Sequence, residues 1–324
     1  MNPDGFLQDV LDEPATLARV LDAYDAPDTP LHALTERIAA ARLTVFLGMG
    51  SSRFAALTAA AALRARGVAA VAEYASTDAP TRPGPDVLAV GISASGNSEE
   101  TVEALARHHG ASATFALTNH PDGGALGAVA DAVLPLHAGE ERGGVACKTF
   151  QATLAVLLRA TGASTAALAP AVDAQAALLD GRDAWLDELL ALLDTPPLNA
   201  YMIAPAARIS SALQAALMFR EGPRIAADSA ETGDWLHVDV YLSKHPNYRA
   251  LLFGGSRYDE GVMEWARERG SSIVAVGRPI AGAALHVGFP GATDPLTCAL
   301  VEVSVAELAA ATWWRRRADA GQMP

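Results

Sequence analysis

The sequence predicts an α/β protein made of two similar halves, each a parallel β-sheet between two layers of helices. Three observations support this fold class. Short apolar runs alternate with helical stretches, this alternation restarts near residue 198, and the composition is 51% hydrophobic but only 6% aromatic. Strands that alternate with helices are typical of parallel sheets covered on both faces. A length of 324 residues also suits two domains of ordinary size.

The first half begins with a predicted helical cover, residues 1–40, in which Leu17, Val20 and Leu21 have helical spacing. The first domain, residues 41–162, then contains apolar runs typical of buried strands and longer alanine- or leucine-rich runs typical of helices. The predicted strands are residues 43–47, 87–92, 113–117 and 132–136, and the predicted helices are residues 54–65, 99–109 and 150–160.

The second half repeats this layout. Residues 163–197 are rich in alanine and leucine and are predicted to be a helical connector, and residues 198–324 form the second domain. Its predicted strands are residues 200–204, 249–253 and 273–276, and its predicted helices are residues 210–220 and 261–269. Such self-similarity indicates an internal repeat.

Charge and composition exclude several classes of function. The formal net charge is −13 and no basic run is present, which argues against a nucleic-acid or anionic-membrane surface. Two cysteines are too few for a disulfide framework, and the N-terminus lacks the pattern of a signal peptide, so we expect a cytoplasmic protein. The apolar segment 296–314 is interrupted by Glu302 and Glu307, so we expect no membrane span.

The strongest local signal is the serine-rich turn at residues 93–98, between an apolar strand and a helix. It consists of Ser93, Ala94, Ser95, Gly96, Asn97 and Ser98. In an open parallel sheet such a turn lies where helix N-termini present unpaired N–H groups to ligands. An ordinary N-cap requires only one serine. Three hydroxyls around a glycine therefore favour an anion site, and the related turn near Gly254 lacks this pattern.

A second turn, Gly48-Met49-Gly50-Ser51-Ser52, leaves two interpretations open. A glycine pair after a strand, with Glu73 further on, is part of the dinucleotide-binding fingerprint. Arg53 stands where that fingerprint requires its third glycine, which argues against a nucleotide. The alternative is that Gly50, Ser51 and Ser52 face the same anion as the serine-rich turn.

With these motifs the sequence resembles the sugar isomerase (SIS) domain family over about residues 40–315, in the tandem arrangement of the isomerase half of glucosamine-6-phosphate synthase. The two turns are similar to the family's phosphosugar loops. The segment 138–150 is similar to a third family motif, with Cys147-Lys148 in place of Thr-Lys. The resemblance implies two tandem flavodoxin-like domains, a phosphorylated hexose or hexosamine as ligand, Lys148 at the binding site, and no cofactor or metal.

The same resemblance implies two catalytic residues. The helix 212–221 is similar to the family helix that ends in a catalytic glutamate, so Glu221 becomes the base that moves a proton between C1 and C2 of the sugar. His237 falls where the family has its ring-opening histidine, which acts in the neighbouring subunit and so implies a homodimer with a shared site. Without the resemblance, the favoured interpretation of Glu221 is a solvated charge at a helix end. The alternative for His237 is a packed loop histidine, and His245 is a lesser competitor.

The sequence also departs from the family. Val238-Asp239 replaces Gly-Pro after the histidine, and residues 319–324 offer no counterpart of the family's lysine-bearing tail. The glutamine-hydrolysing domain of the synthase has no counterpart either. We therefore expect an aldose–ketose isomerase, aminosugar-phosphate deaminase or deglycase that works by metal-free proton transfer. The alternatives are a non-catalytic phosphosugar sensor and a nucleotide-dependent oxidoreductase.

Overall fold

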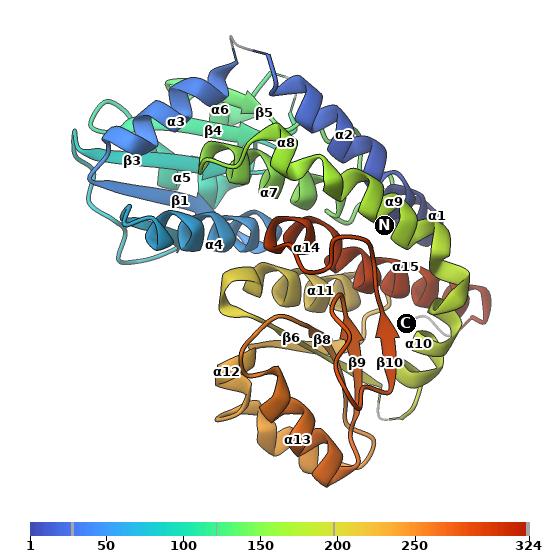
Figure 1. The fold of residues 1–324 in the computed structure, drawn as a ribbon. Helices are drawn as coiled ribbons and strands as arrows, with labels where there is room; N and C mark the ends of the chain where they lie inside the picture. Colours follow the sequence, from blue (N-terminus) through green and yellow to red (C-terminus); the bar gives the residue numbers. More distant parts are fainter. Residues whose placement is uncertain (27–28, 121, 197, 322–324) are drawn as a thin grey trace. The chain divides into compact units, whose positions relative to one another are not determined.

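The computed structural model describes residues 1–26, 29–120, 122–196 and 198–321. The chain divides into two compact units. The first unit comprises residues 15–140 and 146–169, and the second comprises residues 1–14, 141–145 and the chain from Pro170 onward. Each unit contains one five-stranded parallel sheet flanked by helices (Figure 1).

The first unit holds the sheet with strand order β2-β1-β3-β4-β5. Its strands are Leu43–Gly48 (β1), Ala70–Tyr74 (β2), Val87–Ile92 (β3), Ala113–Thr118 (β4) and Ala132–Pro135 (β5). The helices of this part of the chain are Glu13–Ala23 (α2), Pro30–Ala40 (α3), Gly50–Ala65 (α4), Glu99–Ala106 (α5), Gly124–Gly127 (α6), Lys148–Ala160 (α7) and Thr165–Leu168 (α8). All six residues of β3 are buried, as expected for a central strand covered on both faces.

The second unit holds the sheet with strand order β10-β9-β8-β6-β7. Its strands are Asn199–Ala204 (β6), Ala226–Glu231 (β7), Arg249–Phe253 (β8), Ser272–Val276 (β9) and Leu285–Val287 (β10). Its α-helices are Pro3–Leu11 (α1), Pro170–Asp180 (α9), Leu186–Leu193 (α10), Ile209–Glu221 (α11), Thr232–Trp235 (α12), Asp259–Arg269 (α13), Pro295–Val301 (α14) and Val303–Asp319 (α15). Short 3-10 helices span Gly181–Ala184 (η1), Ala206–Arg208 (η2) and Asp239–Lys244 (η3).

The two sheets have the same topology, and the predicted fold class is confirmed. Counted within each unit, both strand orders are 2-1-3-4-5, the flavodoxin-like order, whose ligand crevice lies where the order reverses between strands 1 and 3. In the first unit this switch point lies between β1 and β3, and in the second between β6 and β8. The turns at residues 49–52 and 93–98 follow the two strands that flank the first switch point.

The strand β7 was not predicted from the sequence. Its residues, Ala-Ala-Asp-Ser-Ala-Glu, have no strongly apolar run, and it lies at the edge of its sheet, paired only with β6. An edge strand needs less apolar surface than a central one, so its sequence signal is weak. The short strand β10 lies at the opposite edge and was missed for the same reason.

The domain boundaries drawn from the sequence stay a prediction, and the compact units divide the N-terminal region differently. Helix α1 belongs to the second unit, where Phe6 and Val10 are fully buried. The rings of Phe6 and Trp314 lie 6.4 Å apart, which fixes α1 on α15. Helix α1 is therefore part of the hydrophobic core of the second unit, to which α15 also contributes.

The C-terminal helical segment Pro295–Asp319 is long and apolar enough, by length and composition, to cross a membrane, contrary to the prediction from its two glutamates. However, 89% of its most apolar window is buried inside the protein. Burial of this kind is typical of the core helix of a soluble protein.

Candidate functional site at the end of strand β3

The serine-rich turn leaves the carboxyl end of β3 and leads into α5. Gly96 has a φ of +69°, in the left-handed region that favours glycine. A Cβ at this position would lie 2.7 Å from the carbonyl oxygen of Gly123 and 2.9 Å from the hydroxyl of Thr118. The turn therefore needs glycine both for its backbone conformation and for its close contact with the loop after β4.

The serine hydroxyls gather on one side of the turn. The Oγ of Ser93 lies 3.0 Å from that of Ser98 and 3.5 Å from that of Ser95. The backbone N–H of Asn97 donates to the Oγ of Ser95 at 3.2 Å, and the Asn97 side chain accepts from the N–H of Ala125 at 3.0 Å. Ser93 is buried while Ser95 and Asn97 are exposed, so the cluster opens to solvent on one side.

Several backbone donors of the turn are available to a ligand. Within the described residues, the N–H groups of Ala94 and Ser95 have no hydrogen-bond partner. Ser98 is the N-cap of α5, but its side chain makes no capping hydrogen bond, so the first N–H groups of that helix are not satisfied by the cap. Unpaired N–H groups, hydroxyls and a helix N-terminus together make a site suited to a phosphate or another anion.

The turn after β1 lies next to the serine-rich turn. Gly48 and Ile92, the last residues of β1 and β3, are paired in register, so the following turns leave the same edge of the sheet side by side. Ser51 and Ser52 lie in the first turn of α4 and are partly exposed, and their hydroxyls have no hydrogen-bond partner in the described part of the chain. The structure thus brings these predicted ligand residues to the switch point.

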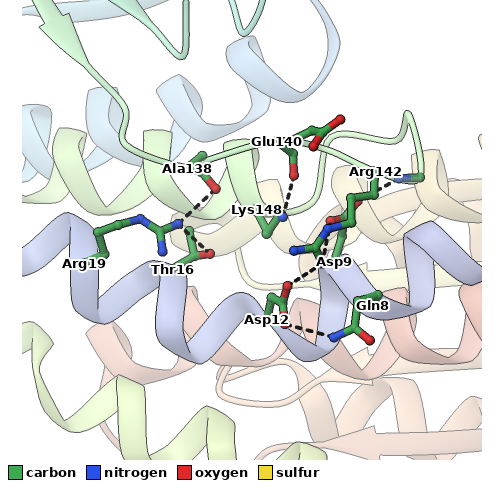
Figure 2. Close-up of polar contacts among 10 residues, drawn as sticks. Gln8, Asp9, Asp12, Thr16, Arg19, Ala138, Glu140, Arg142 and Lys148 are labelled. Atoms are coloured by element: carbon green, nitrogen blue, oxygen red, sulfur yellow. Dashed lines mark hydrogen bonds and ion pairs between the residues drawn. The ribbon is translucent and has the colours of Figure 1, made fainter. Parts of the chain in front are cut away.

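Lys148 has a different environment from the serines. It is the first residue of α7 and is 3% exposed, and its Nζ donates to the carbonyl oxygen of Glu140 at 2.6 Å (Figure 2). In the same unit, Arg19 donates to the carbonyl oxygens of His137 and Ala138 at 2.9 and 3.1 Å. Both cations therefore hold the backbone of the loop after β5.

The middle of that loop, residues 141–145, belongs to the second unit, where α1 holds it (Figure 2). The carboxylate of Asp9 accepts from the backbone N–H of Gly143 at 2.8 Å, and Arg142 contacts Asp12 at 2.6 Å. Asp9 is fully buried. No local sequence pattern indicates these contacts of Asp9 and Asp12, because the partners lie about 130 residues apart.

A cavity of about 680 Å³ opens at the carboxyl ends of β4 and β5. Its lining includes His120 and His137, neither of which was singled out from the sequence. His137 has a φ of +54°, which is uncommon outside glycine, and burial together with nearby Arg19 lowers the pKa of its imidazole. The Cβ of His120 lies against Gly96, so this cavity adjoins the serine-rich turn.

Glu221 is the last residue of α11 and is partly buried. Burial raises the pKa of its carboxyl above the ordinary value, and the neighbouring Arg220 partly offsets this. A raised pKa suits a carboxylate that must both take and return a proton.

His237 lies beyond the opposite end of the second sheet from Glu221. Helix α11 connects β6 to the parallel strand β7, so Glu221 at its end precedes β7, whereas His237 follows β7 and α12. The six residues of β7 span about 20 Å. Within this unit, therefore, the structure does not bring the two predicted catalytic residues together, and His237 is exposed.

Residues 37–161 match the model of the SIS domain family. This part of the chain is therefore similar to an SIS domain. The match covers β1 to β5 and both turns at the switch point, and the second sheet lies outside it. None of the curated proteins matches the sequence.

Several solved structures share the whole fold. The C-terminal domain of glucosamine-fructose-6-phosphate aminotransferase from Francisella tularensis is 17% identical with a TM-score of 0.81, and the alignment covers 97% of this chain and 96% of that one. Glucosamine-6-phosphate deaminase from Thermotoga maritima is 18% identical with a TM-score of 0.75, covering 97% and 95%. Tagatose-6-phosphate ketose/aldose isomerase from Escherichia coli is 17% identical with a TM-score of 0.78, covering 94% and 91%. At these identities the likeness shows the fold, which in these structures carries phosphosugar chemistry.

Proposed function

We propose that the SIS domain binds the phosphate group of a phosphorylated sugar at residues 93–98, and that the protein isomerises or deaminates an aminosugar phosphate or ketose phosphate. The observation that supports this most is that the N–H groups of Ala94 and Ser95 at the switch point have no partner among the described residues and lie beside a cluster of serine hydroxyls. Neutral donors suit a protein of net charge −13, since they hold an anion without a basic surface.

In this proposal Glu221 moves a proton between C1 and C2 of the open-chain sugar, through an enediol or enamine. Its partly buried carboxyl and raised pKa support the role of a general base. The test is incubation of the protein with glucosamine 6-phosphate, followed by assays for ammonia and fructose 6-phosphate. We expect Glu221→Gln to abolish turnover while leaving binding intact, and unchanged activity in this variant contradicts the assignment.

We propose that His237 opens the sugar ring in the active site of a second copy of the chain. Two observations support a shared site. Glu221 and His237 lie beyond opposite ends of the sheet in one unit, and His237 is flanked by apolar side chains on the surface, Val238 at 56% and Tyr241 at 63% exposure. Tyr258, 40% exposed, lies against Gly233 of α12 and extends this apolar surface.

Mixing two inactive variants tests the shared site. If each site takes Glu221 from one chain and His237 from the other, refolding Glu221→Gln together with His237→Ala restores part of the activity, because some mixed dimers contain one intact site. No restoration, with dimers present in both preparations, excludes sharing. A monomer that binds phosphosugars without turnover supports the alternative function, a phosphosugar sensor. The separation of Glu221 and His237 within one unit is compatible with that alternative.

The proposed compartment is the cytoplasm. Cys147 and Cys298 are both buried and outside any disulfide, and such side chains persist in reducing compartments.

A further inference from the structure

The second unit contains a turn that corresponds, residue by residue, to the serine-rich turn. In the first unit the N–H of Ser93 donates to Leu117 of the next strand at 3.0 Å, and in the second the N–H of Gly254 donates to Val276 at 3.1 Å. These pairs lie at equivalent places, directly after the central strands β3 and β8. Ser93 therefore corresponds to Gly254.

A second hydrogen bond confirms this correspondence. The N–H of Asn97 donates to the Oγ of Ser95 at 3.2 Å, and the N–H of Tyr258 donates to the Oγ of Ser256, also at 3.2 Å. The two turns thus share this hydrogen bond, although their backbones differ, since φ is positive at Gly96 in the first turn and at Gly255 in the second. Counting on by one residue, Ser98 corresponds to Asp259.

The side chain at this position behaves differently in the two turns. One oxygen of the Asp259 carboxylate folds back and accepts the N–H of Gly255 at 2.6 Å. Burial raises the pKa of this carboxyl, and the backbone of Gly255 and Ser256 partly offsets the effect. The corresponding donors of the first turn are the N–H groups of Ala94 and Ser95, which have no partner among the described residues. The hydroxyl of Ser98 instead lies beside that of Ser93.

The surroundings of Asp259 match the role of a bound anion. The Arg208 guanidinium donates to the carbonyl oxygen of Gly254 at 2.7 Å and, with Arg278, attracts the Asp259 carboxylate. Arg208 lies at the end of η2, after β6, so it reaches the second switch point from the other flanking strand. The second crevice thus contains backbone donors of the kind an external anion would need, beside an arginine that is also paired with Glu302 at 2.9 Å.

We propose that the residue at this one position decides whether a turn binds an external anion: Asp259 is a built-in anion that fills the second turn, and Ser98 leaves the first turn open to a phosphosugar. The chain therefore takes one phosphosugar, in its SIS domain, despite having two switch points of the same topology. This inference rests on the proposed phosphate site for the first turn alone; the occupation of the second turn stands by itself.

Reciprocal exchange tests the proposal, with inorganic phosphate as the probe in equilibrium dialysis of the full chain. Ser98→Asp places a carboxylate within reach of the N–H groups of Ala94 and Ser95, so we expect phosphate affinity to fall at least about tenfold. Ser98→Ala is the matched control, because it removes the hydroxyl without adding an anion and loses less. Asp259→Ser frees the second turn, so the capacity rises by one phosphate per chain. Asp259→Asn keeps an oxygen that accepts the N–H of Gly255 and leaves the capacity unchanged.

The outcomes separate this inference from the proposed function. If the unaltered chain binds no phosphate, the proposed function fails. The second turn is still tested in that case, because Asp259→Ser should then bind one phosphate per chain. If Asp259→Ser binds no more phosphate than the unaltered chain and its circular dichroism is native, the inference is overturned. Phosphate affinity in Ser98→Asp equal to that in Ser98→Ala overturns it as well, even if Asp259→Ser does not fold.

Discussion

The two units share a sheet topology but differ in where they keep charge. Among the described residues, six of the buried Asp, Glu, Lys and Arg side chains lie in the second unit and only Lys148 lies in the first. The six are Asp9, Glu13, Arg208, Arg249, Glu302 and Glu307. The first unit offers neutral donors at its switch point, whereas in the second Arg208 pairs with Glu302 at 2.9 Å. Two sheets of the same topology can therefore differ in chemistry: one has neutral donors at its switch point, and the other has a buried ion pair there.

The largest effect on stability should come from the buried Arg208–Glu302 pair. Their side chains are 9% and 0% exposed, so Glu302→Ala leaves a buried guanidinium without its partner. We expect a loss of about 3–5 kcal/mol in the free energy of unfolding, measured by urea denaturation. The double variant Arg208→Met with Glu302→Met removes both charges and should recover most of the loss. A single variant as stable as the parent would show that the pair is not needed.

The second prediction concerns pH and the buried pair Glu13 and Glu307. The carboxylate of Glu13 accepts from Gln175 at 2.7 Å and from Ser304 at 2.8 Å. Burial is the main cause that raises the pKa of both carboxyls, and the pKa of Glu307 rises to about 7. The charge of nearby Glu141 raises both pKa values further. The unfolded chain releases these protons near pH 4.5, and the folded chain keeps them to higher pH.

Stability should therefore decrease as pH rises from about 4.5 to about 7. For one proton, the expected change in the folding equilibrium constant is on the order of a hundredfold. The double variant Glu13→Gln with Glu307→Gln should show a flatter profile in urea denaturation at a series of pH values. Glu264→Gln, at an exposed carboxyl on α13, is the control and should follow the parent. Parallel profiles for the parent and the double variant would disprove the coupling.

A smaller loss of stability, with a large loss of binding, is expected for Gly96→Ala. A residue with a side chain pays about 1–2 kcal/mol in the left-handed region, and here the added Cβ also meets Gly123 and Thr118. The matched control is Gly110→Ala, where φ is +74° and no atom lies within 4 Å of the added Cβ. Both variants should unfold more easily, but only Gly96→Ala should lose binding of glucosamine 6-phosphate in a calorimetric titration. Equal binding in the two variants would argue against the turn as the site.

The smallest effect is expected for the surface pair Arg42 and Asp86 of the first unit. Their side chains are 65% and 52% exposed, and the hydrogen bond from Arg42 lowers the pKa of Asp86. Solvent screening removes most of the stabilising free energy of such an exposed ion pair. Asp86→Asn should therefore leave the midpoint of thermal unfolding at pH 7 within the scatter of the measurement. A clear decrease would mean that surface charge also matters in the first unit.

Much of the fold followed from the sequence because its signals are local. Strands such as 87–92 and 249–253 are short apolar runs bounded by turn residues, and the structure has both at the same bounds. The edge strand β7 gave no such signal. The site residues proposed from the sequence remain predictions, although Ser93 to Ser98 already indicated a cluster of donors.

The sequence by itself determined the α/β class and the serine-rich turn, since periodicity and turn chemistry act over a few residues. Only the tertiary structure decided which groups meet at each switch point. Arg208 and Glu302 are 94 residues apart, and no local pattern links them. Nor could residue type alone show that Asp259 occupies the donors that Ser98 leaves open, because that depends on how the backbone N–H groups of each turn are oriented by the strands before them.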